Sequence, residues 1–319
     1  MRAAVVNSPE SPPVCAEFPD PEHRPDRPPL RLVGAGLHHV VRGLASGRHY
    51  GSEHAYPLVP GVDAVARTED GRLVYTGLAR SPWGTMAELL VTPFEVELPA
   101  GADPLAVAAG MNPAMSGWMP LTARREEAGE PGTVLVLGAT GVSGGLAVRA
   151  ALSLGAKRVV AAGRDPEALE ALRGLGAVTV PLAAAAPEAW AAALGAVVAE
   201  AQPALVLDFV WGPVAEAAFA ALGRTGTEDD SAPVDYVQIG SLAGTEAALP
   251  AALLRSRRIR ISGSGTGSVS KARVIAELPE IIARFGDGTF DAPYTVYPLS
   301  RVGEAWAHQG RARAVIVPD

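Results

Sequence analysis

Residues 133–165 read TVLVLGATGVSGGLAVRAALSLGAKRVVAAGRD, and this stretch decides the fold. An apolar run at 133–137 leads into a glycine turn, a helix of small residues follows, and a second apolar run at 159–162 ends at Gly163. Apolar β-type residues, a turn, a helical segment and a second β-type run are typical of a βαβ unit. We therefore expect a parallel sheet that begins here.

The glycine turn fits the pattern Gly/Ala-x-Gly-x-x-Gly at 139–144. In this pattern Ala139 permits the tight exit from the strand, Gly141 lets a pyrophosphate approach the backbone, and Gly144 lets the helix pack close to the strand. The free N–H groups at the helix N-terminus favour an anion. We expect a dinucleotide there, the alternative being a plain connection from strand to helix. The expected contacts are Ala139, Thr140, Gly141, Val142 and Ser143.

Gly163 and Arg164 stand where the second strand ends, which is the position that reads the ribose of a bound dinucleotide. NAD-binding proteins usually place Asp or Glu there, whereas a guanidinium suits a 2′-phosphate through paired hydrogen bonds. We therefore expect NADP(H). The alternative is that Arg164 is a solvated helix cap and that Asp165 reads the ribose.

The composition excludes several classes of protein. The chain has 319 residues, of which 48% are hydrophobic, but it has no apolar run long enough for a membrane span. Its one cysteine, Cys15, rules out an internal disulfide, so we expect the reducing cytoplasm. The net charge is −7, and the only short basic cluster, at 255–258, precedes a strand, which speaks against nucleic acid as a partner.

The rest of the chain divides around the βαβ unit. Before it, short apolar runs and a hairpin signal at Asp70-Gly71 indicate a small β-rich domain, with the proline-rich segment 9–29 wrapping the outside. Helical spacing at 107–121 is interrupted by Asn112-Pro113. After the βαβ unit, strand and helix signals alternate, as in a parallel sheet with helices on both faces. Expected elements lie at 183–201, 205–207, 214–222, 236–239, 259–261, 272–285, 301–308 and 314–317.

Five motifs follow one another along the chain: 34–38 GAGLH, 60–63 PGVD, 84–88 GTMAE, the glycine turn, and 310–316 GRARAVI. In this order they resemble the medium-chain dehydrogenase/reductase superfamily, and within it the zinc-free quinone oxidoreductase branch. The resemblance covers nearly the whole chain. It implies an α/β protein in which a Rossmann doubly wound parallel sheet, residues 113–287, is inserted in a discontinuous GroES-like β-rich domain, residues 1–112 and 288–319.

Zinc-dependent members hold a catalytic metal at positions that match His38, Val62 and Asn112. Valine cannot bind zinc and asparagine is a poor ligand, so the three-donor site is lost and we expect no metal. The hydroxyl that relays a proton in those members would fall at Val40, which has none. His38 and His39 are neighbours, but on an extended strand they would point to opposite faces.

The resemblance also implies which residues contact the cofactor. His38 and Ser116 would lie near the nicotinamide, Asn112 beside them, and Arg311 before the last strand; a core histidine, a helix serine and a solvent-facing arginine are the alternatives. Tyr50 lies on the segment that lines the substrate pocket and is the candidate proton donor, against a packed surface tyrosine. At the carboxyl edge of the sheet, where ligands bind, we expect nicotinamide contacts from Val210, Gly240 and Ser241.

These features favour an NADPH-dependent reductase of a quinone or of a carbonyl-activated double bond. A short-chain reductase is an alternative because its glycine turn is similar, although that turn normally lies near the N-terminus. A non-catalytic NADPH-binding sensor or structural protein is the alternative from another class, because no side chain is an obligatory acid. The resemblance also suggests a homodimer formed through the strand at 259–261, whose edge could equally be covered within one chain.

Overall fold

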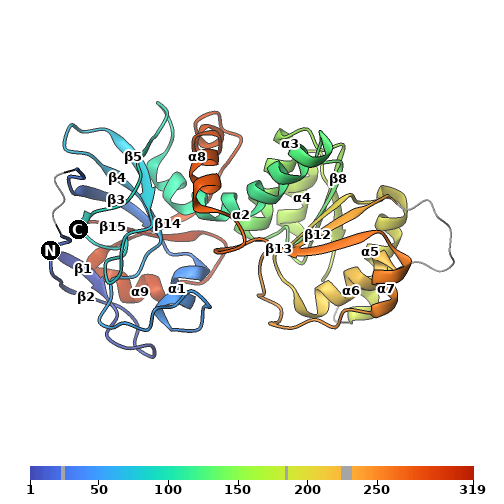
Figure 1. Ribbon diagram of the computed structural model, residues 1–319, viewed down its shortest axis with the longest axis horizontal. Helices are drawn as coiled ribbons and strands as arrows, with labels where there is room; N and C mark the ends of the chain where they lie inside the picture. Colours follow the sequence, from blue (N-terminus) through green and yellow to red (C-terminus); the bar gives the residue numbers. More distant parts are fainter. Residues whose placement is uncertain (23–25, 184–185, 224–231) are drawn as a thin grey trace. The chain divides into compact units, whose positions relative to one another are not determined.

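The computed structural model describes residues 1–22, 26–183, 186–223 and 232–319. The chain forms two compact units, the first from Met1–Pro113 with Lys271–Asp319 and the second from Ala114–Ser270. Both termini belong to the first unit, where Arg2 pairs with Asp319 at 2.6 Å (Figure 1).

The second boundary between the units differs from the one we expected at 287/288. Helix α8 (Lys271–Gly286) belongs to the first unit because its apolar face packs there. The Phe285 ring contacts Phe290 with centroids 5.4 Å apart, and a Cβ added at Gly110 would lie 2.7 Å from the Phe285 ring. The apolar run at 272–285 therefore completes the core of the β-rich unit rather than covering the parallel sheet.

The second unit is built on a six-stranded parallel sheet with the order β10-β9-β8-β11-β12-β13. Numbered within the unit this order is 3-2-1-4-5-6, which places the reversal of strand order at β8 and β11. The expected βαβ unit is confirmed, because β8 and β9 are parallel neighbours and α3 lies between them in the chain. The strands are β8 (Thr133–Leu137), β9 (Arg158–Gly163), β10 (Val178–Pro181), β11 (Leu205–Asp208), β12 (Val234–Gln238) and β13 (Ile259–Gly263).

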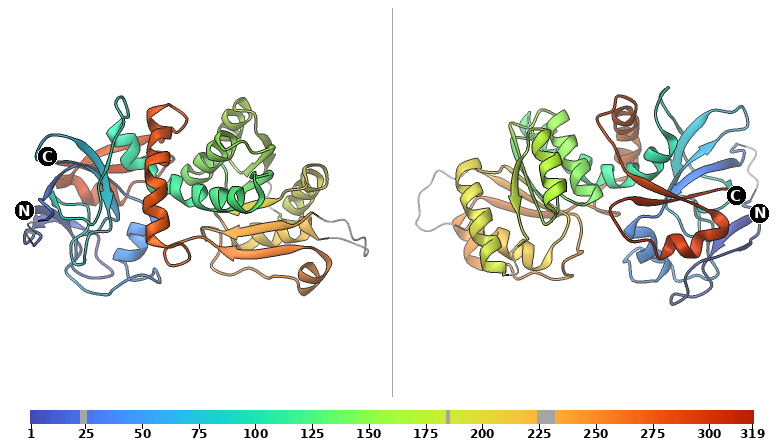
Figure 2. Two further views of the ribbon diagram at one scale, coloured as in Figure 1. Left: turned by 45° about the horizontal axis from the view of Figure 1, so that its top comes forward. Right: turned by 180° about the vertical axis from the view of Figure 1, so that it is seen from behind.

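Helices lie on both faces of this sheet (Figures 1 and 2). On one face, Leu194, Phe219 and Leu253 from three helices form a buried cluster with sheet residues such as Leu135 and Tyr236. The helix expected at 183–201 begins at Pro187, and residues 184–185 lie outside the described chain. The helices are α3 (Val142–Ser153), α4 (Pro166–Gly174), α5 (Pro187–Ala201), α6 (Gly212–Leu222) and α7 (Ala251–Ser256).

Helix α2 (Pro104–Ala128) is continuous, so the interruption that we expected at Asn112-Pro113 is wrong. A proline inside a helix costs about 3 kcal/mol because it removes one hydrogen bond and crowds the preceding turn. The neighbouring Met111 and Trp118 are fully buried, and each such side chain contributes roughly 1.5–3 kcal/mol. Burial therefore outweighs the local penalty of the proline.

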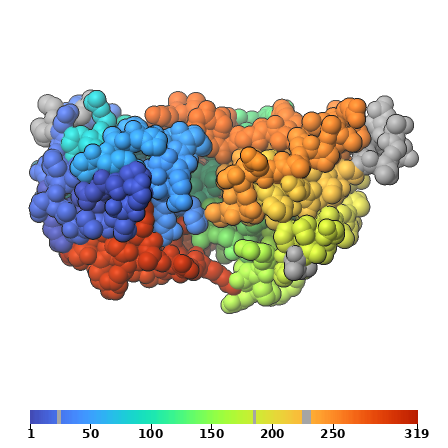
Figure 3. Space-filling view, turned by 90° about the horizontal axis from the view of Figure 1, so that it is seen from below, coloured from blue at the N-terminus to red at the C-terminus, as the bar shows by residue number. Residues whose placement is uncertain are grey.

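The first unit contains a seven-stranded sheet with the path β14-β15-β3-β4-β5-β7, and β6 pairs with β3. The C-terminal β15 joins β3 in antiparallel pairing, so blue and red residues lie side by side in Figure 3. The expected hairpin around Asp70-Gly71 is β4 with β5. The strands are β1 (Arg2–Val5), β2 (Val14–Glu17), β3 (Leu30–Gly36), β4 (Asp63–Arg67), β5 (Leu73–Gly77), β6 (Leu89–Leu90), β7 (Val96–Glu97), β14 (Tyr294–Pro298) and β15 (Arg313–Val317).

Three short helical segments complete this unit: α1 (His39–Ala45), the 3₁₀ turn η1 (Leu299–Arg301) and α9 (Val302–Trp306). Strand β2 lies within the proline-rich segment and, among the described strands, forms a separate two-stranded sheet with β1, so this part of the segment stays outside the main sheet as expected. Within the described residues, no helix is long and apolar enough to cross a membrane.

Candidate active site

The glycine turn between β8 and α3 brings the backbone of the helix onto the end of the strand. Gly138 has a φ of +83°, and its N–H and that of Ala139 both donate to the carbonyl of Ala162 on β9. A Cβ added at Gly144 would lie 2.2 Å from the Gly138 carbonyl oxygen, which no side chain can occupy. Gly144 is therefore required for the close packing of helix on strand, as the sequence pattern predicts.

The outer face of the same turn is open. Gly141 is the N-cap of α3 and has no side chain that could bond the N–H groups of the first helical turn. A Cβ added there would meet only the Gly138 carbonyl oxygen, at 3.6 Å. Backbone donors at a helix N-terminus with room in front of them fit a pyrophosphate. Ala139, Thr140, Gly141, Val142 and Ser143 all lie on this turn.

The end of β9 lies against the glycine turn. A Cβ on Gly163 would lie 2.4 Å from the Thr140 methyl carbon, so Gly163 lets the two segments touch. Arg164 follows immediately, is exposed, and forms no hydrogen bond or ion pair with the described residues. Asp165, rather than Arg164, caps α4 by accepting a hydrogen bond from the Ala168 N–H at 3.0 Å. This geometry favours Arg164 as the residue that is free to bind a phosphate.

Asp208, at the end of β11, organises the neighbouring edge of the sheet. It is fully buried, and one carboxylate oxygen accepts hydrogen bonds from the N–H groups of Val210 and Trp211, both at 2.9 Å. The other oxygen accepts from the Tyr236 hydroxyl at 2.6 Å. Burial raises the pKa of Asp208, while these hydrogen bonds oppose the rise. These bonds tie the ends of β11 and β12 together.

Val210, Gly240 and Ser241 lie at this same edge, beyond the carboxyl ends of β11 and β12. A Cβ on Gly240 would lie 2.4 Å from the Phe209 carbonyl oxygen, so the two strand ends approach closely only because residue 240 is glycine. A Cβ on Gly138 would lie 2.8 Å from a Val210 methyl carbon. The structure therefore brings the ends of β8, β11 and β12 together at the reversal of strand order.

A buried polar cluster in the first unit centres on Asp63, which the sequence reasoning missed. His38 is 2% exposed and its Nε2 lies 3.0 Å from Asp63 Oδ1. The Tyr75 hydroxyl donates to Asp63 Oδ2 at 2.8 Å, and burial together with the carboxylate raises the pKa of Tyr75 well above its usual value. His38 Nδ1 is buried and has no hydrogen-bond partner within the described residues.

Comparison with known proteins places this fold in a family. A probable NADPH-dependent quinone reductase of Emericella nidulans is 32% identical, and the alignment covers the whole of both chains. The chain belongs to the quinone oxidoreductase branch of the medium-chain dehydrogenase/reductases. Among solved structures, the quinone oxidoreductase of Thermus thermophilus, also determined with NADPH, is 26% identical with a TM-score of 0.78, over 99% of this chain and 100% of that one. An alcohol dehydrogenase superfamily protein from Novosphingobium aromaticivorans shares the fold at 21% identity and TM-score 0.79, over the whole of both chains. No protein-family model matches the chain.

The fold class expected from the sequence is confirmed for this quinone oxidoreductase family member. The expected extended strand at His38 and His39 is wrong, because β3 ends at Gly36 and His39 begins α1. Only His38 of the two is buried. A Cβ on Gly36 would lie 2.5 Å from the His38 ring, so Gly36 makes room for the imidazole.

The other expected site residues lie in less enclosed positions. Tyr50 is 74% exposed and stacks on His49 with ring centroids 4.1 Å apart. Asn112 and Ser116 lie four residues apart on α2 and are both partly buried, while Arg311 is exposed. Among described residues, no group of three His, Cys, Asp or Glu side chains is arranged to hold a metal ion.

A groove of ≈ 770 Å³ lies within the first unit. Its walls include Tyr56, Pro57, Arg80 and Pro82, but not Tyr50. The Tyr56 hydroxyl donates to the Ala45 carbonyl at 2.8 Å, so this ring is held in place. The groove gives the first unit a concave surface with one aromatic side chain, Tyr56, and two cationic ones, Arg80 and Lys271.

Proposed function

We propose that this protein is an NADPH-dependent reductase that transfers a hydride to a quinone or an α,β-unsaturated carbonyl without a metal ion. The observation that carries the proposal is the glycine turn. Its open helix N-terminus lies directly beside Arg164, which is exposed and has no partner among the residues that the structure describes. One feature suits a pyrophosphate and the other a 2′-phosphate. The likeness to a probable NADPH-dependent quinone reductase supports the same assignment.

NADPH supplies the hydride when it is bound, and the side chains of this protein bind and orient the reactants. Residues 139–143 hold the pyrophosphate and Arg164 holds the 2′-phosphate. Orientation alone can lower a barrier by roughly 7–11 kcal/mol, which makes a strong acid unnecessary. Val210, Gly240, Ser241, His38, Asn112, Ser116 and Arg311 are proposed as the further contacts to the cofactor.

Tyr50 or a water molecule is proposed to supply the proton that accompanies the hydride. Tyr50 is 74% exposed, so a bound acceptor can approach this residue from solvent. Replacing Tyr50 with Phe removes this hydroxyl and keeps the ring on His49. A lowered kcat with an unchanged KM for NADPH supports the donor role, and an unchanged kcat excludes it.

Arg164→Gln tests the cofactor assignment. Hydrogen bonds to charged groups contribute about 1.5–3 kcal/mol, so we expect kcat/KM for NADPH to fall about 10–150-fold while that for NADH changes little. Arg173→Gln is the matched control, because Arg173 is exposed on α4 and pairs with Glu170 on the same helix. Equal use of NADPH and NADH by the unmodified protein contradicts the role of Arg164.

A non-catalytic sensor of NADPH is the second candidate, supported by the lack of an obligatory acid. Steady NADPH consumption with a panel of quinones and enones separates the two functions. An enzyme oxidises NADPH through many turnovers with at least one acceptor. A sensor binds NADPH, as followed by its fluorescence, but no acceptor drives oxidation.

The proposal also covers the metal content, the oligomeric state, the location and the partners of the protein. Activity should survive dialysis against a chelator, since Val62 and Asn112 replace zinc ligands. The edge strand β13 should pair with a second copy, giving a homodimer by light scattering. A cytoplasmic location fits a chain with a single cysteine, and nucleic acid and membranes are not expected as partners.

A further inference from the structure

Two arginines of the first unit are partly buried and have no acidic partner among the described residues. Arg42, on α1, donates through Nη2 to the carbonyls of Trp306 and His308 at 3.1 and 3.3 Å. Arg313, at the start of β15, makes a long bond of 3.4 Å to the carbonyl of Leu37. Neither guanidinium forms an ion pair within the described part of the chain, and the Nε atom of each is buried without a hydrogen-bond partner there.

The neighbouring carboxylate cannot neutralise both arginines. Asp63 is the acid that raises the pKa of Arg313, but its two oxygens are already engaged by His38 and Tyr75. Burial and the proximity of Arg42 outweigh this effect and lower the pKa of Arg313 to about 10. Burying a charge without a close partner costs several kcal/mol, and two like charges add to that cost. An anion between the arginines would remove this cost.

We propose that Arg42 and Arg313 form an anion site that recognises an acidic acceptor, namely a quinone that carries an ionised sulfonate, carboxylate or hydroxyl group. This inference rests on the proposed function and specifies its substrate class. The cofactor phosphates have their own donors in the second unit, the glycine turn and Arg164. The arginines of the first unit are therefore left for the acceptor, and the paired N–H donors of a guanidinium can bind two oxygens of a carboxylate or a sulfonate.

The experiment compares two quinones that differ in charge, 1,4-naphthoquinone-2-sulfonate and the neutral 2-methyl-1,4-naphthoquinone. The unmodified protein should prefer the sulfonate. In Arg313→Met we expect kcat/KM for the sulfonate to fall about tenfold or more, mostly through KM, while the neutral quinone changes less than about twofold. Arg67→Met is the matched control, because Arg67 is an exposed arginine of the same sheet whose guanidinium donates to the Gly71 carbonyl of its own hairpin.

A second variant and a binding measurement keep the inference testable if Arg313→Met folds poorly. Arg313→Lys keeps the positive charge but loses the paired N–H donors of the guanidinium, so this variant should retain an intermediate preference for the sulfonate. Naphthalene-2-sulfonate cannot be reduced, and it should inhibit competitively against the neutral quinone. Its binding to the protein, measured by calorimetry, should weaken about tenfold in Arg313→Met.

The outcomes separate this inference from the proposed function. If neither quinones nor enones are reduced, the proposed function fails, and binding of naphthalene-2-sulfonate alone decides whether the anion site exists. If quinones are reduced but kcat/KM for the sulfonate and for the neutral quinone changes equally in Arg313→Met, the anion site is refuted. If the KM for NADPH rises as much as that for the sulfonate, the arginines bind a cofactor phosphate and the acidic acceptor is refuted.

Discussion

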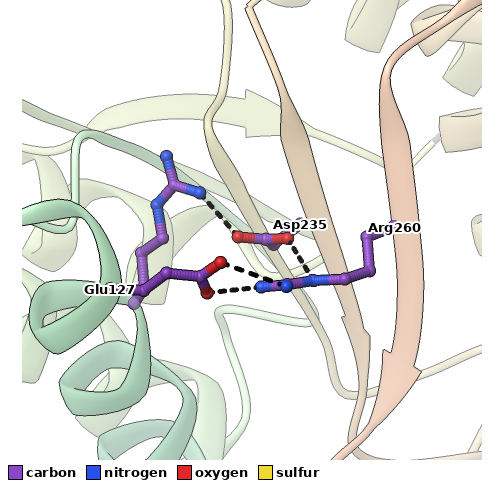
Figure 4. A network of polar contacts seen from close by, with 4 residues as sticks. Glu127, Asp235 and Arg260 are labelled. Carbon is purple, nitrogen blue, oxygen red and sulfur yellow. Dashed lines mark hydrogen bonds and ion pairs between the residues drawn. The ribbon is translucent and has the colours of Figure 1, made fainter.

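Replacing Asp235 with Asn tests the polar network that joins α2 to the sheet of the second unit (Figure 4). Asp235, on β12, accepts hydrogen bonds from Arg124 at 2.6 Å and from Arg260 at 2.9 Å. Arg260 lies opposite Asp235 on the edge strand β13 and also binds both carboxylate oxygens of Glu127. Positive and negative side chains therefore alternate in the order Arg124, Asp235, Arg260 and Glu127, and the network connects the end of α2 with the edge strand.

The magnitude follows from burial. The side chains of Arg124 and Asp235 are 15% and 12% exposed, so the variant leaves a largely buried guanidinium without its carboxylate. Breaking a fully buried pair costs about 3–5 kcal/mol, and partial exposure together with the retained Glu127–Arg260 pair reduces this to about 2–3 kcal/mol. For a unit of this size the melting temperature should fall by about 4–12 °C.

The assay is thermal and urea unfolding followed by circular dichroism, with Glu127→Gln as the matched control. Glu127 lies at the exposed end of the same network, so its loss should lower stability less, and roughly 0.5 M salt should abolish this smaller loss because the Debye length is then only a few ångströms. The effect of Asp235→Asn should persist in salt, and adding Arg124→Met should recover part of it. Equal, salt-sensitive losses in both single variants would show that the network is only a surface feature.

Two further predictions concern the sheet edge. Gly144→Ala should abolish NADPH binding, because the new Cβ would lie 2.2 Å from the Gly138 carbonyl oxygen, whereas Gly145→Ala, with its nearest atom at 3.6 Å, should bind normally by fluorescence titration. Tyr236→Phe should lower the free energy of unfolding by about 1.5–3 kcal/mol at pH 7. Burial raises the pKa of Asp208 in the folded state, so the folded state loses stability as pH rises through this raised pKa. The Tyr236 hydroxyl stabilises the carboxylate, so removing it should raise the pKa of Asp208 further and enlarge the loss of stability at high pH. The destabilisation should therefore be larger at pH 7 than at pH 4 in urea titrations, and an equal loss at both would mean that Asp208 is not the partner that matters.

The sequence predicted the second unit well because its signals are local. The glycine turn, the apolar runs and the small residues at 144, 163 and 240 each follow from contacts between neighbouring segments of one sheet edge. The strand β10 and helix α4 were missed because β10 has only four residues and a polar Thr179 within it. The place of α8 was also missed, since an amphipathic helix does not reveal which core it covers.

The polar cluster of the first unit could not be derived in the same way. Asp63 and Tyr75 meet because the hairpin register pairs Val65 with Tyr75, which places Asp63 diagonally opposite on the same face. A buried acid at the start of an apolar strand was the available signal. Arg313, which the sequence did not single out, is held in the sheet because it pairs with Tyr294 of β14, and that register is set only by tertiary structure.

The pairing of β15 with β3 has a consequence for the order of synthesis. The Arg313 side chain bonds the Leu37 carbonyl across 276 residues of chain, so the sheet of the first unit stays incomplete until the last strand leaves the ribosome. At roughly 5–20 residues per second this interval is about 15–55 s, long enough for the contiguous residues 114–270 to fold first. The edge of β3 that pairs with β15 is open throughout this interval, so a chaperone that covers exposed strand edges during translation would raise the yield of native protein.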